Sequence, residues 1–564
     1  MLLRSTLFKR TRPMVLLCVL MALVMPLALR AVSPTSRVTL SSTSLPPGCL
    51  GDPEQGFTYT SPREASAFYS NGSAAPSAGA PYVCANNTNY GGAESTVQVA
   101  PNGDVVEEPA MTAPGLLGTG AVADAPGTVP TGTPAGSATV PRDDWAFAST
   151  SGLVVSKDGG KDSSWQFTRP AGQEHDCCDT ALYIDRKTGT LYYSSIFDTP
   201  PAPLDQAEPI TLPAAEIEAA TYDANGATDY TNWTAPSTMY GMVSENPRFT
   251  SASVPAGGAP AVAGQDVTYW CGNGPGRQTR ECYRTLDGGQ TWEFASILDS
   301  PLTGQCASGS APNFAYPVGG PQGAVYDLVS CGSTATYLAR STDEGTTWPL
   351  VTNAKGNPVV VPGSPTEIRV DSAGNIYAFQ LDGTAIEVEI SRNGGQTWSP
   401  WYNMTAPAAR GESVFQWQVS VGYVSGQVTA AYFVKKSSAG GTSVPGGLGS
   451  ASGNPGGWYD AYLTTSHDAV GANPVFYAAT VNPPNLPLMT AGDPGAGDDW
   501  LWSDMGPDGS GWGSFYSACE QSASGVYLDP ACAAAAQFST APLGSPDNPV
   551  EAETVGRLWF PSSK

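Results

Sequence analysis

Hydrophobic and polar residues alternate along many short segments of this chain, and glycine-containing turns separate the segments. Ala181–Asp185 is followed by Thr190–Tyr193, and Glu367–Asp371 is followed by Ile376–Phe379. Alternation of this kind, rich in Val, Ile and Tyr, is typical of half-buried strands. The four residues that join each pair include a glycine, which suits a tight connection. The pattern therefore predicts a chain built from β-hairpins.

Three segments repeat one eight-residue pattern, Ser/Thr-x-Asp/Asn-x-Gly-x-Thr-Trp. They are Thr285–Trp292, Ser341–Trp348 and Ser391–Trp398. The Asp or Asn with its glycine is turn chemistry, and the tryptophan can bury a large apolar area between neighbouring sheets. Structural roles are therefore expected at six positions: Asp287, Asp343, Asn393, Trp292, Trp348 and Trp398.

Weaker copies begin at Ser156, Thr221 and Ser466, and their acidic residues are Asp158, Asp223 and Asp468. The six starts lie 50 to 75 residues apart, a spacing that suits the repeats of a β-propeller. Two hairpins per repeat give the four strands of one blade. We predict an all-β fold, a β-propeller with six or seven four-stranded blades. A seventh blade would use the hairpin at 500–515 with residues 554–560 or an N-terminal strand.

These segments resemble the Asp-box of bacterial neuraminidase repeat (BNR) proteins, a group that includes sialidases, sortilin-type receptors and many secreted proteins. The resemblance covers about residues 93–520. It implies a sialidase-like β-propeller in which each box forms the turn between the third and fourth strands of a blade. The boxes would then lie on the rim, away from the central site. The resemblance bears on fold more than function, because one fold hosts many activities.

Charge excludes one class of partner. The chain has 564 residues, with 26 Lys and Arg against 50 Asp and Glu, and a net charge of −24. Nucleic acid is not expected as a partner, because phosphate binding needs a basic surface. Only two histidines occur, His175 and His467, so one chain cannot form a multi-histidine metal centre. We expect neither a metal nor a cofactor.

The first residues predict export. Four basic residues among the first twelve precede the uncharged apolar run Met14–Leu29. This run is short for a membrane span, which needs about 20 residues, and suits a signal peptide over residues 1–31. An uncleaved anchor is the alternative. We expect a secreted, extracellular protein without a later membrane span, or a protein attached to the cell surface if the segment is retained.

Ten cysteines follow the predicted signal peptide, and an even number in an exported chain suggests disulfides. Pairs close in sequence are the preferred hypothesis, although the connectivity stays open. The expected pairs are Cys49–Cys84, Cys271–Cys282, Cys306–Cys331, Cys519–Cys532 and the vicinal Cys177–Cys178.

The domain organisation follows from composition. Residues 32–92 are expected to form a disulfide-tied lead-in, and residues 93–564 the propeller. Residues 109–140 and 437–457 are rich in small residues and Pro or Gly and are interpreted as loop insertions. We expect a monomer.

Ligands of propellers usually bind at the axis, near the starts of the innermost strands. The charged residues expected there are Asp176, Asp179, Arg248, Glu367, Arg410, Glu412 and Asp499. The Glu174–Asp179 segment could be a metal or redox site, or a disulfide-tied loop before a strand, which we prefer. Six tryptophans could stack on sugar rings or belong to the core: Trp145, Trp417, Trp458, Trp500, Trp502 and Trp512.

The resemblance also implies what a sialidase needs: three arginines around the substrate carboxylate, a tyrosine nucleophile and two carboxylates. Only Arg248 and Arg410 are suitably placed. Arg557 is a distant third, and Tyr516 is a conceivable nucleophile by position alone. The leading hypothesis is therefore a non-catalytic recognition module that binds a glycan or an extracellular protein on its axial face. The alternative is a sialidase-like exo-glycoside hydrolase.

Overall fold

The fold is that of a computed structural model, in which the described residues belong to one compact unit, Leu40–Lys564. They are 63–77, 81–91, 93–110, 153–157, 159–160, 165–168, 177–197, 214–222, 228–240, 247–254, 265–273, 280–298, 313–314, 316–330, 335–436, 458–482, 489–490, 501–518 and 551–560.

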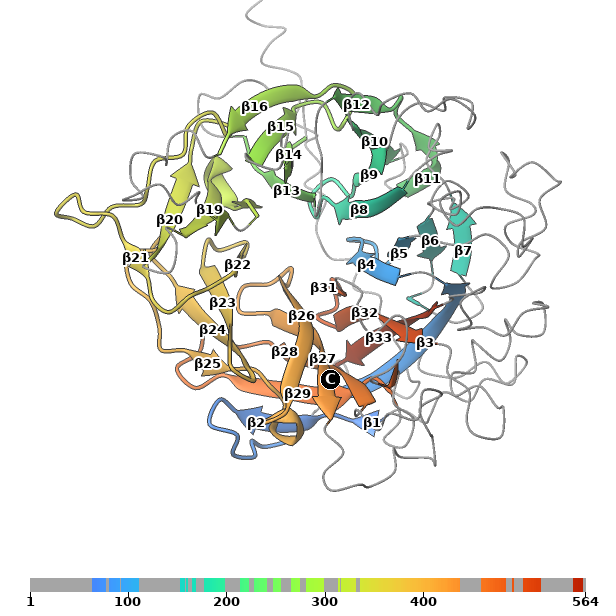
Figure 1. Cartoon of the computed structure of the whole chain (residues 1–564), viewed down its shortest axis with the longest axis vertical. Helices are drawn as coiled ribbons and strands as arrows, with labels where there is room; N and C mark the ends of the chain where they lie inside the picture. The colour runs from blue at the N-terminus through green and yellow to red at the C-terminus, as the bar shows by residue number, and fades with distance from the viewer. Residues whose placement is uncertain are drawn as a thin grey trace, which may run out of the picture. The chain divides into compact units, whose positions relative to one another are not determined.

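Seven antiparallel sheets form the blades of a β-propeller (Figure 1). Blade 1 consists of β4 (Ala93–Val99), β5 (Val105–Ala110), β6 (Leu153–Ser156) and β7 (Trp165–Thr168), and blade 2 consists of β8 (Cys177–Ile184), β9 (Leu191–Phe197), β10 (Ala214–Tyr222), β11 (Thr228–Trp233) and β12 (Ser237–Tyr240). Blade 3 consists of β13 (Arg248–Ala252), β14 (Val267–Asn273), β15 (Arg280–Thr285) and β16 (Glu293–Ile297). Blade 4 consists of β17 (Asn313–Phe314), β18 (Val318–Gly319), β19 (Val325–Ser330), β20 (Thr336–Ser341) and β21 (Val360–Val361).

The remaining three blades contain the C-terminal half of the propeller and three N-terminal strands. Blade 5 consists of β22 (Glu367–Val370), β23 (Ile376–Asp382), β24 (Ala385–Ser391) and β25 (Tyr402–Asn403). Blade 6 consists of β26 (Ser413–Val421), β27 (Val428–Lys436), β28 (Trp458–Ser466), β29 (Val475–Thr480), β30 (Met489–Thr490) and β2 (Ser66–Tyr69). Blade 7 consists of β31 (Trp502–Met505), β32 (Gly511–Ala518), β33 (Glu551–Trp559), β3 (Tyr82–Gly91) and β1 (Arg63–Glu64). The prediction of a propeller is confirmed, with seven blades.

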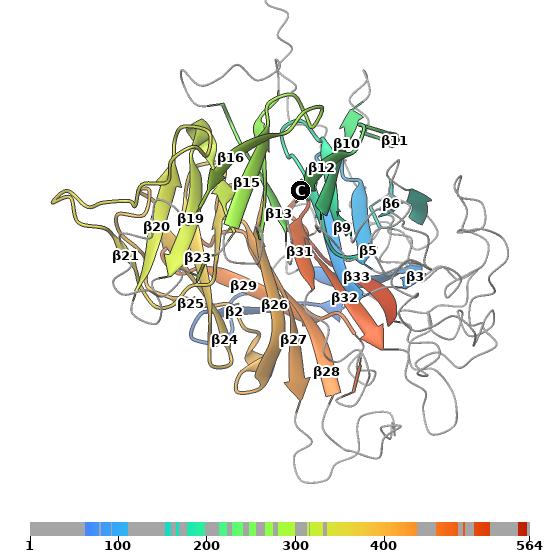
Figure 2. The ribbon, with the colours of Figure 1, turned by 45° about the horizontal axis from the view of Figure 1, so that its top comes forward.

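One inner strand from each blade lines the centre of the ring. These strands are β4, β8, β13, β18, β22, β26 and β31, and they contact one another in this order, with β31 returning to β4. We call this ring of inner strands the hub (Figures 1 and 2). The seven inner strands run in the same direction along the hub, and each is followed by its hairpin partner in the same blade. We call the end of the hub at which they begin the starting end.

N-terminal strands complete the last two blades. β3 pairs with the C-terminal strand β33, with Tyr82 opposite Trp559, and β2 pairs with β29 of blade 6. Figure 1 shows the blue N-terminal strands beside the orange and red blades. The described part of the expected lead-in, 32–92, thus supplies strands to blades 6 and 7. The ring is closed by joining the two ends of the chain.

Clusters of apolar side chains fill the seams between blades. Trp512 packs with Val97 and Val105 between blades 7 and 1, and Trp270 packs with Ile217 between blades 2 and 3. Both tryptophans are fully buried. Burial of a large apolar side chain contributes about 1.5–3 kcal/mol, so stacking of neighbouring blades is the main apolar contribution to stability.

The three strong repeats adopt the same hydrogen-bonded turn after the third strand of blades 3, 4 and 5. The backbone N–H of the repeat's glycine donates to the first Ser or Thr hydroxyl, at 2.9 Å for Gly289, 3.0 Å for Gly345 and 2.8 Å for Gly395. Gly289 has φ +90°, and a Cβ there would meet the Ala219 Cβ at 2.5 Å. The turn therefore requires glycine for its backbone angle and for its close contact with the preceding blade.

The acidic position of the repeat holds the turn from the other side. Asp343 accepts the backbone N–H and the hydroxyl of Thr347, at 2.9 and 2.6 Å, and Asp287 does the same for Thr291. In the weaker copy at 466, the Ser466 hydroxyl donates to Asp468. The corresponding Asp158 and Asp223 lie outside the described residues. In the repeats at 285, 341 and 466, the acidic side chain is hydrogen-bonded within its own turn.

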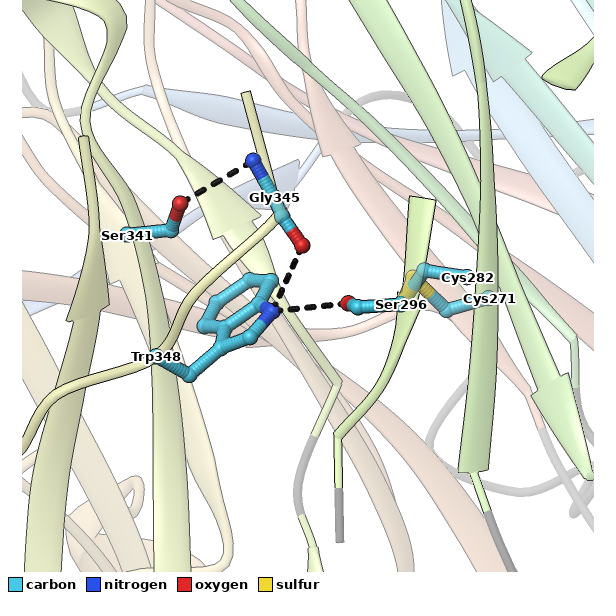
Figure 3. Close-up of a disulfide and its surroundings, with 6 residues drawn as sticks. All are labelled: Cys271, Cys282, Ser296, Ser341, Gly345 and Trp348. Atoms are coloured by element: carbon cyan, nitrogen blue, oxygen red, sulfur yellow. Dashed lines mark hydrogen bonds between the residues drawn. A yellow bond between two sulfur atoms is a disulfide. The ribbon is translucent and has the colours of Figure 1, made fainter. Parts of the chain in front are cut away.

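The repeat tryptophan joins neighbouring blades. Trp348 is 1% exposed, and its Nε1–H donates to Ser296 Oγ on blade 3 and to the Gly345 carbonyl, both at 2.9 Å (Figure 3). Trp292 is half-buried and packs against Tyr192 of blade 2, with ring centroids 6.0 Å apart. Trp398 packs into the cluster between blades 4 and 5.

A disulfide joins Cys271 of β14 to Cys282 of β15 close to Trp348, which confirms that predicted pair (Figure 3). Cys84 is also disulfide-bonded, and its partner is not among the side chains that the structure describes. Cys177 and Cys178 begin β8, with their side chains undescribed. The remaining predicted cysteines lie outside the described residues: Cys49, Cys306, Cys331, Cys519 and Cys532.

Replacing Ser341 with alanine is expected to lower the free energy of unfolding by about 1–2 kcal/mol, because the buried Gly345 N–H loses its acceptor. Urea unfolding measures the change. Ser341→Thr is the matched control, since Thr285 fills the equivalent position in blade 3. Equal stability of the alanine variant and the wild type would show that this bond does not stabilise the turn.

Among the described residues, no helix has the length and apolarity needed to cross a bilayer.

Candidate functional site

Residues from four blades meet at the starting end of the hub. Arg248, Glu367 and Trp502 are the first residues of β13, β22 and β31, and Tyr316 lies two residues before β18. All four side chains are partly exposed. A propeller brings strand starts together from residues far apart in sequence, and this is how an arginine, a carboxylate and two aromatic rings become neighbours.

The Arg248 guanidinium lies between two aromatic rings. Its Cζ is 3.9 Å from the centroid of the Trp502 ring and 4.7 Å from that of Tyr316. Blades 3 and 7, which supply Arg248 and Trp502, are not neighbours in the ring. This contact therefore spans the hub. Arg280 approaches Tyr316 as well, at 4.3 Å, and desolvated cation–π contacts of this kind are worth about 2 kcal/mol.

Arg248 combines a hydrogen bond to Tyr316 with one buried donor that the described residues leave unpaired. Its buried Nε–H has no hydrogen-bond partner among the described residues. Burial lowers the pKa of Arg248, and the nearby Arg369 lowers it further, while Tyr316 and Glu367 oppose the shift.

Arg369 is held firmly beside it. Its Nη1 is 2.8 Å from Glu367 Oε2, and its Nε donates to the Val419 carbonyl at 3.0 Å. A further contact joins its Nη2 to Gln418 Oε1 at 3.4 Å. The Glu367 carboxylate is therefore already paired, and Arg369 positions it facing Arg248.

A second arginine spans the opposite end of the hub, where the inner strands finish. Arg186 follows β8, and its guanidinium bonds Asp504 Oδ1 on blade 7 and the Val421 carbonyl on blade 6, both at 2.6 Å. The other oxygen of Asp504 accepts the Val99 N–H of blade 1 at 2.8 Å. Burial opposes the charge of Arg186, but Asp504 and Tyr423 outweigh it and raise its pKa. We call Arg186 and Asp504 the hub clasp.

Other candidates do not join the starting-end cluster. Arg410 precedes β26 but turns outward, donating to the Ser70 carbonyl at 2.9 Å beside the outermost strand of blade 6. Glu412 is half-buried in the turn that precedes β26. Arg557 lies 2.6 Å from Asp508 and against the Trp512 ring, in the seam of blade 7. The three arginines considered for a sialidase site are therefore dispersed.

The remaining candidates cannot be placed. Asp176 and Asp499 lie outside the described residues, while Asp179 and Tyr516 are on β8 and β32 with undescribed side chains. In the described part of the chain, no group of three or more His, Cys, Asp or Glu side chains could hold a metal ion.

Sequence reasoning missed Arg186, Arg369 and Tyr316. Arg369 alternates with apolar residues in a predicted strand, and Arg186 lies in a predicted hairpin turn, but neither signal distinguishes these residues from exposed arginines. Trp502 was only one of six tryptophans considered. Its ring becomes recognisable as part of the cluster once blades 3 and 7 face each other across the hub.

The chain matches no protein-family model and no curated protein. Among solved structures, it is similar to a Trypanosoma rangeli sialidase, at 12% identity and a TM-score of 0.31, over 74% of this chain and 57% of that one. It is also similar to a mutant of the Aleuria aurantia lectin AAL in complex with Fucα1-6GlcNAc, at 8% identity, a TM-score of 0.35 and coverages of 71% and 97%. These scores are low, and the propeller assignment rests on the strand pairing itself.

Proposed function

We propose that this protein is a secreted recognition module that binds a glycan at the starting end of the hub and does not catalyse a reaction. The observation that carries the proposal is the Arg248 guanidinium beside the rings of Trp502 and Tyr316, three partly exposed side chains at the starting end of the hub. Aromatic faces stack on the apolar side of sugar rings, and guanidinium groups bind hydroxyl or carboxylate oxygens. A protein ligand bound on the same face is the other form of this proposal.

The cluster supports binding better than hydrolysis. Retaining and inverting glycosidases use a pair of carboxyl groups that flank the scissile bond. At this end the carboxylate that faces Arg248 is Glu367, and it is already paired with Arg369. The contact with Arg369 fixes the position of this carboxylate, which suits orientation of a ligand.

Arg248→Ala is expected to weaken glycan binding about 30-fold or more, because central arginines that contact a ligand typically contribute about 2 kcal/mol. A glycan array followed by calorimetry on the best ligand measures the loss. Arg284→Gln is the matched control, since Arg284 belongs to the same blade but pairs with Glu293 away from the hub. Unchanged affinity of Arg248→Ala would exclude this cluster as the binding site.

The same variants separate binding from catalysis. Wild-type protein is expected to release no fluorogenic aglycone from sialosides. Turnover that disappears in Arg248→Ala but persists in Arg284→Gln would instead establish a sialidase-like hydrolase.

A further inference from the structure

A β-bulge near the start of β26 turns a phenylalanine toward solvent. Val414 lies opposite Val434 and Trp417 lies opposite Tyr432, so two residues, Phe415 and Gln416, occupy the space of one. Bulges of this kind re-aim side chains and are frequent beside functional sites. Phe415 is 36% exposed although it belongs to an inner strand.

Phe415 is held firmly by its neighbours. Its ring lies 5.1 Å from the ring of Tyr459, which is itself buried at 4% exposure. Lys435 Nζ lies 5.8 Å from the centroid of the same Tyr459 ring. The exposed aromatic face therefore has a buried aromatic base and a cation beside it, an arrangement that loses little conformational entropy when a ligand binds.

The charge at this position is unusual for the protein. Lys435 and Lys436 are consecutive in a chain with 26 basic and 50 acidic residues. Neither lysine forms a salt bridge in the part of the chain that the structure describes, and Lys436 donates to the Ala408 carbonyl at 2.9 Å. Successive residues of a strand point to opposite faces, and Lys436 lies over Tyr462 on the other face of the blade, so Lys435 is the cation beside Tyr459 and favours an anionic group on the ligand.

This patch lies at the same end of the propeller as the starting-end cluster. Phe415 lies near the start of β26, Lys435 near the end of its antiparallel partner β27, and Tyr459 near the start of β28, so all three are at the starting end. Gln418, three residues after Phe415, contacts Arg369 of the cluster. Three residues of extended chain separate Phe415 from Gln418 by about 10 Å, and Arg369 lies beyond Gln418, so a ligand that touches both sites must be an oligosaccharide.

We propose that Phe415, Tyr459 and Lys435 form a second sugar subsite, which takes an anionic ring of an oligosaccharide that reaches the Arg248 cluster with another of its rings. This inference rests on the proposed function and specifies its ligand class: an oligosaccharide of at least two rings that carries a carboxylate or sulfate. The apolar face of that ring stacks on Phe415, and its anionic group lies over Lys435.

The test compares variants on an array of defined neutral, uronate-bearing, sialylated and sulfated glycans of one to six rings. Phe415→Ala is expected to weaken binding of anionic oligosaccharides about 3- to 10-fold and to leave single-ring ligands unaffected. Phe415→Trp is expected to retain binding, and Lys435→Gln to remove the preference for anionic over neutral glycans. Phe294→Ala and Lys355→Gln are the controls, since both side chains are exposed on other blades.

Thermal unfolding of each variant shows whether the fold is intact. If Phe415→Ala is destabilised, Phe415→Leu keeps apolar contact with Tyr459 without an aromatic face and is expected to show the same loss of binding. Anionic binding that is lost in Arg248→Ala but unchanged in the Phe415 and Lys435 variants would overturn the second subsite alone. Absence of any glycan ligand for the wild type would overturn both proposals.

Discussion

Replacing Asp504 with alanine is expected to lower the free energy of unfolding by about 3–5 kcal/mol, because the change leaves the Arg186 guanidinium in the hub without its carboxylate. The Val99 N–H of blade 1 loses its acceptor at the same time. Arg186 of blade 2 and Asp504 of blade 7 also bond the Val421 carbonyl of blade 6 and the Val99 N–H of blade 1, so the substitution weakens contacts among four blades.

Chemical denaturation of the wild type and the variant measures this effect. The matched control is Asp266→Ala, which removes the partner of Lys187, a side chain that is 56% exposed. Exposed pairs contribute about 0–1 kcal/mol, so the control is expected to change stability little. Similar small losses for both variants would mean that the hub clasp does not hold the ring together.

Replacing Glu389 with methionine is expected to stabilise the protein by up to about 5 kcal/mol at pH 8 and above. Glu389 lies on β24 opposite Ala378 and is fully buried, and neither of its carboxylate oxygens accepts a hydrogen bond in the described part of the chain. Burial raises its pKa from 4.5 to about 8. Each pKa unit corresponds to about 1.4 kcal/mol, and methionine has a similar shape without the charge.

The direction of the pH dependence follows from this shift. Below pH 4.5 the carboxyl group is protonated in both the folded and the unfolded chain, and burial then costs least. Between pH 4.5 and about 8 the unfolded chain releases its proton while the folded chain retains it, so stability falls as the pH rises and then levels off.

Urea unfolding at pH 5, 6.5 and 8 tests this prediction through the difference between Glu389→Met and the wild type. That difference is expected to grow with pH. Glu387→Met is the control, because Glu387 accepts a hydrogen bond from Gln380 at 2.9 Å and is only half-buried. A difference between Glu389→Met and the wild type that stays constant with pH would show that Glu389 ionises normally in the folded protein.

Local interactions explain which parts of the fold could be predicted. Ser341, Asp343 and Gly345 bond within a single eight-residue repeat, so their roles follow from the sequence of that repeat. Pairing of β3 with β33 joins opposite ends of the chain and depends on the completed ring. The sequence therefore left six or seven blades open, and it left open whether an N-terminal strand completed the last one.

The candidate site also combines residues that could be predicted from the local sequence with residues whose positions depend on the completed ring. Arg248 and Glu367 were found because they begin strands, and the structure brings these two together. Arg410 satisfied the same rule, but its guanidinium turns to Ser70, whose position depends on the pairing of β2 with blade 6. Glu389 alternates with apolar residues along β24, a pattern that predicts an exposed side chain. Neighbouring blades cover both faces of β24, however, so the side chain is buried.

The pairing of β3 with β33 also determines when the molecule can finish folding. Blade 7 needs residues 82–91 and 551–559 at once, so a ribosome must synthesise the chain through residue 559 before the ring can close. Contacts between such distant segments form slowly. Until then, the nascent chain presents an open sheet edge on blade 7, which can pair with other chains and aggregate. Chaperones would therefore matter most at this stage of synthesis.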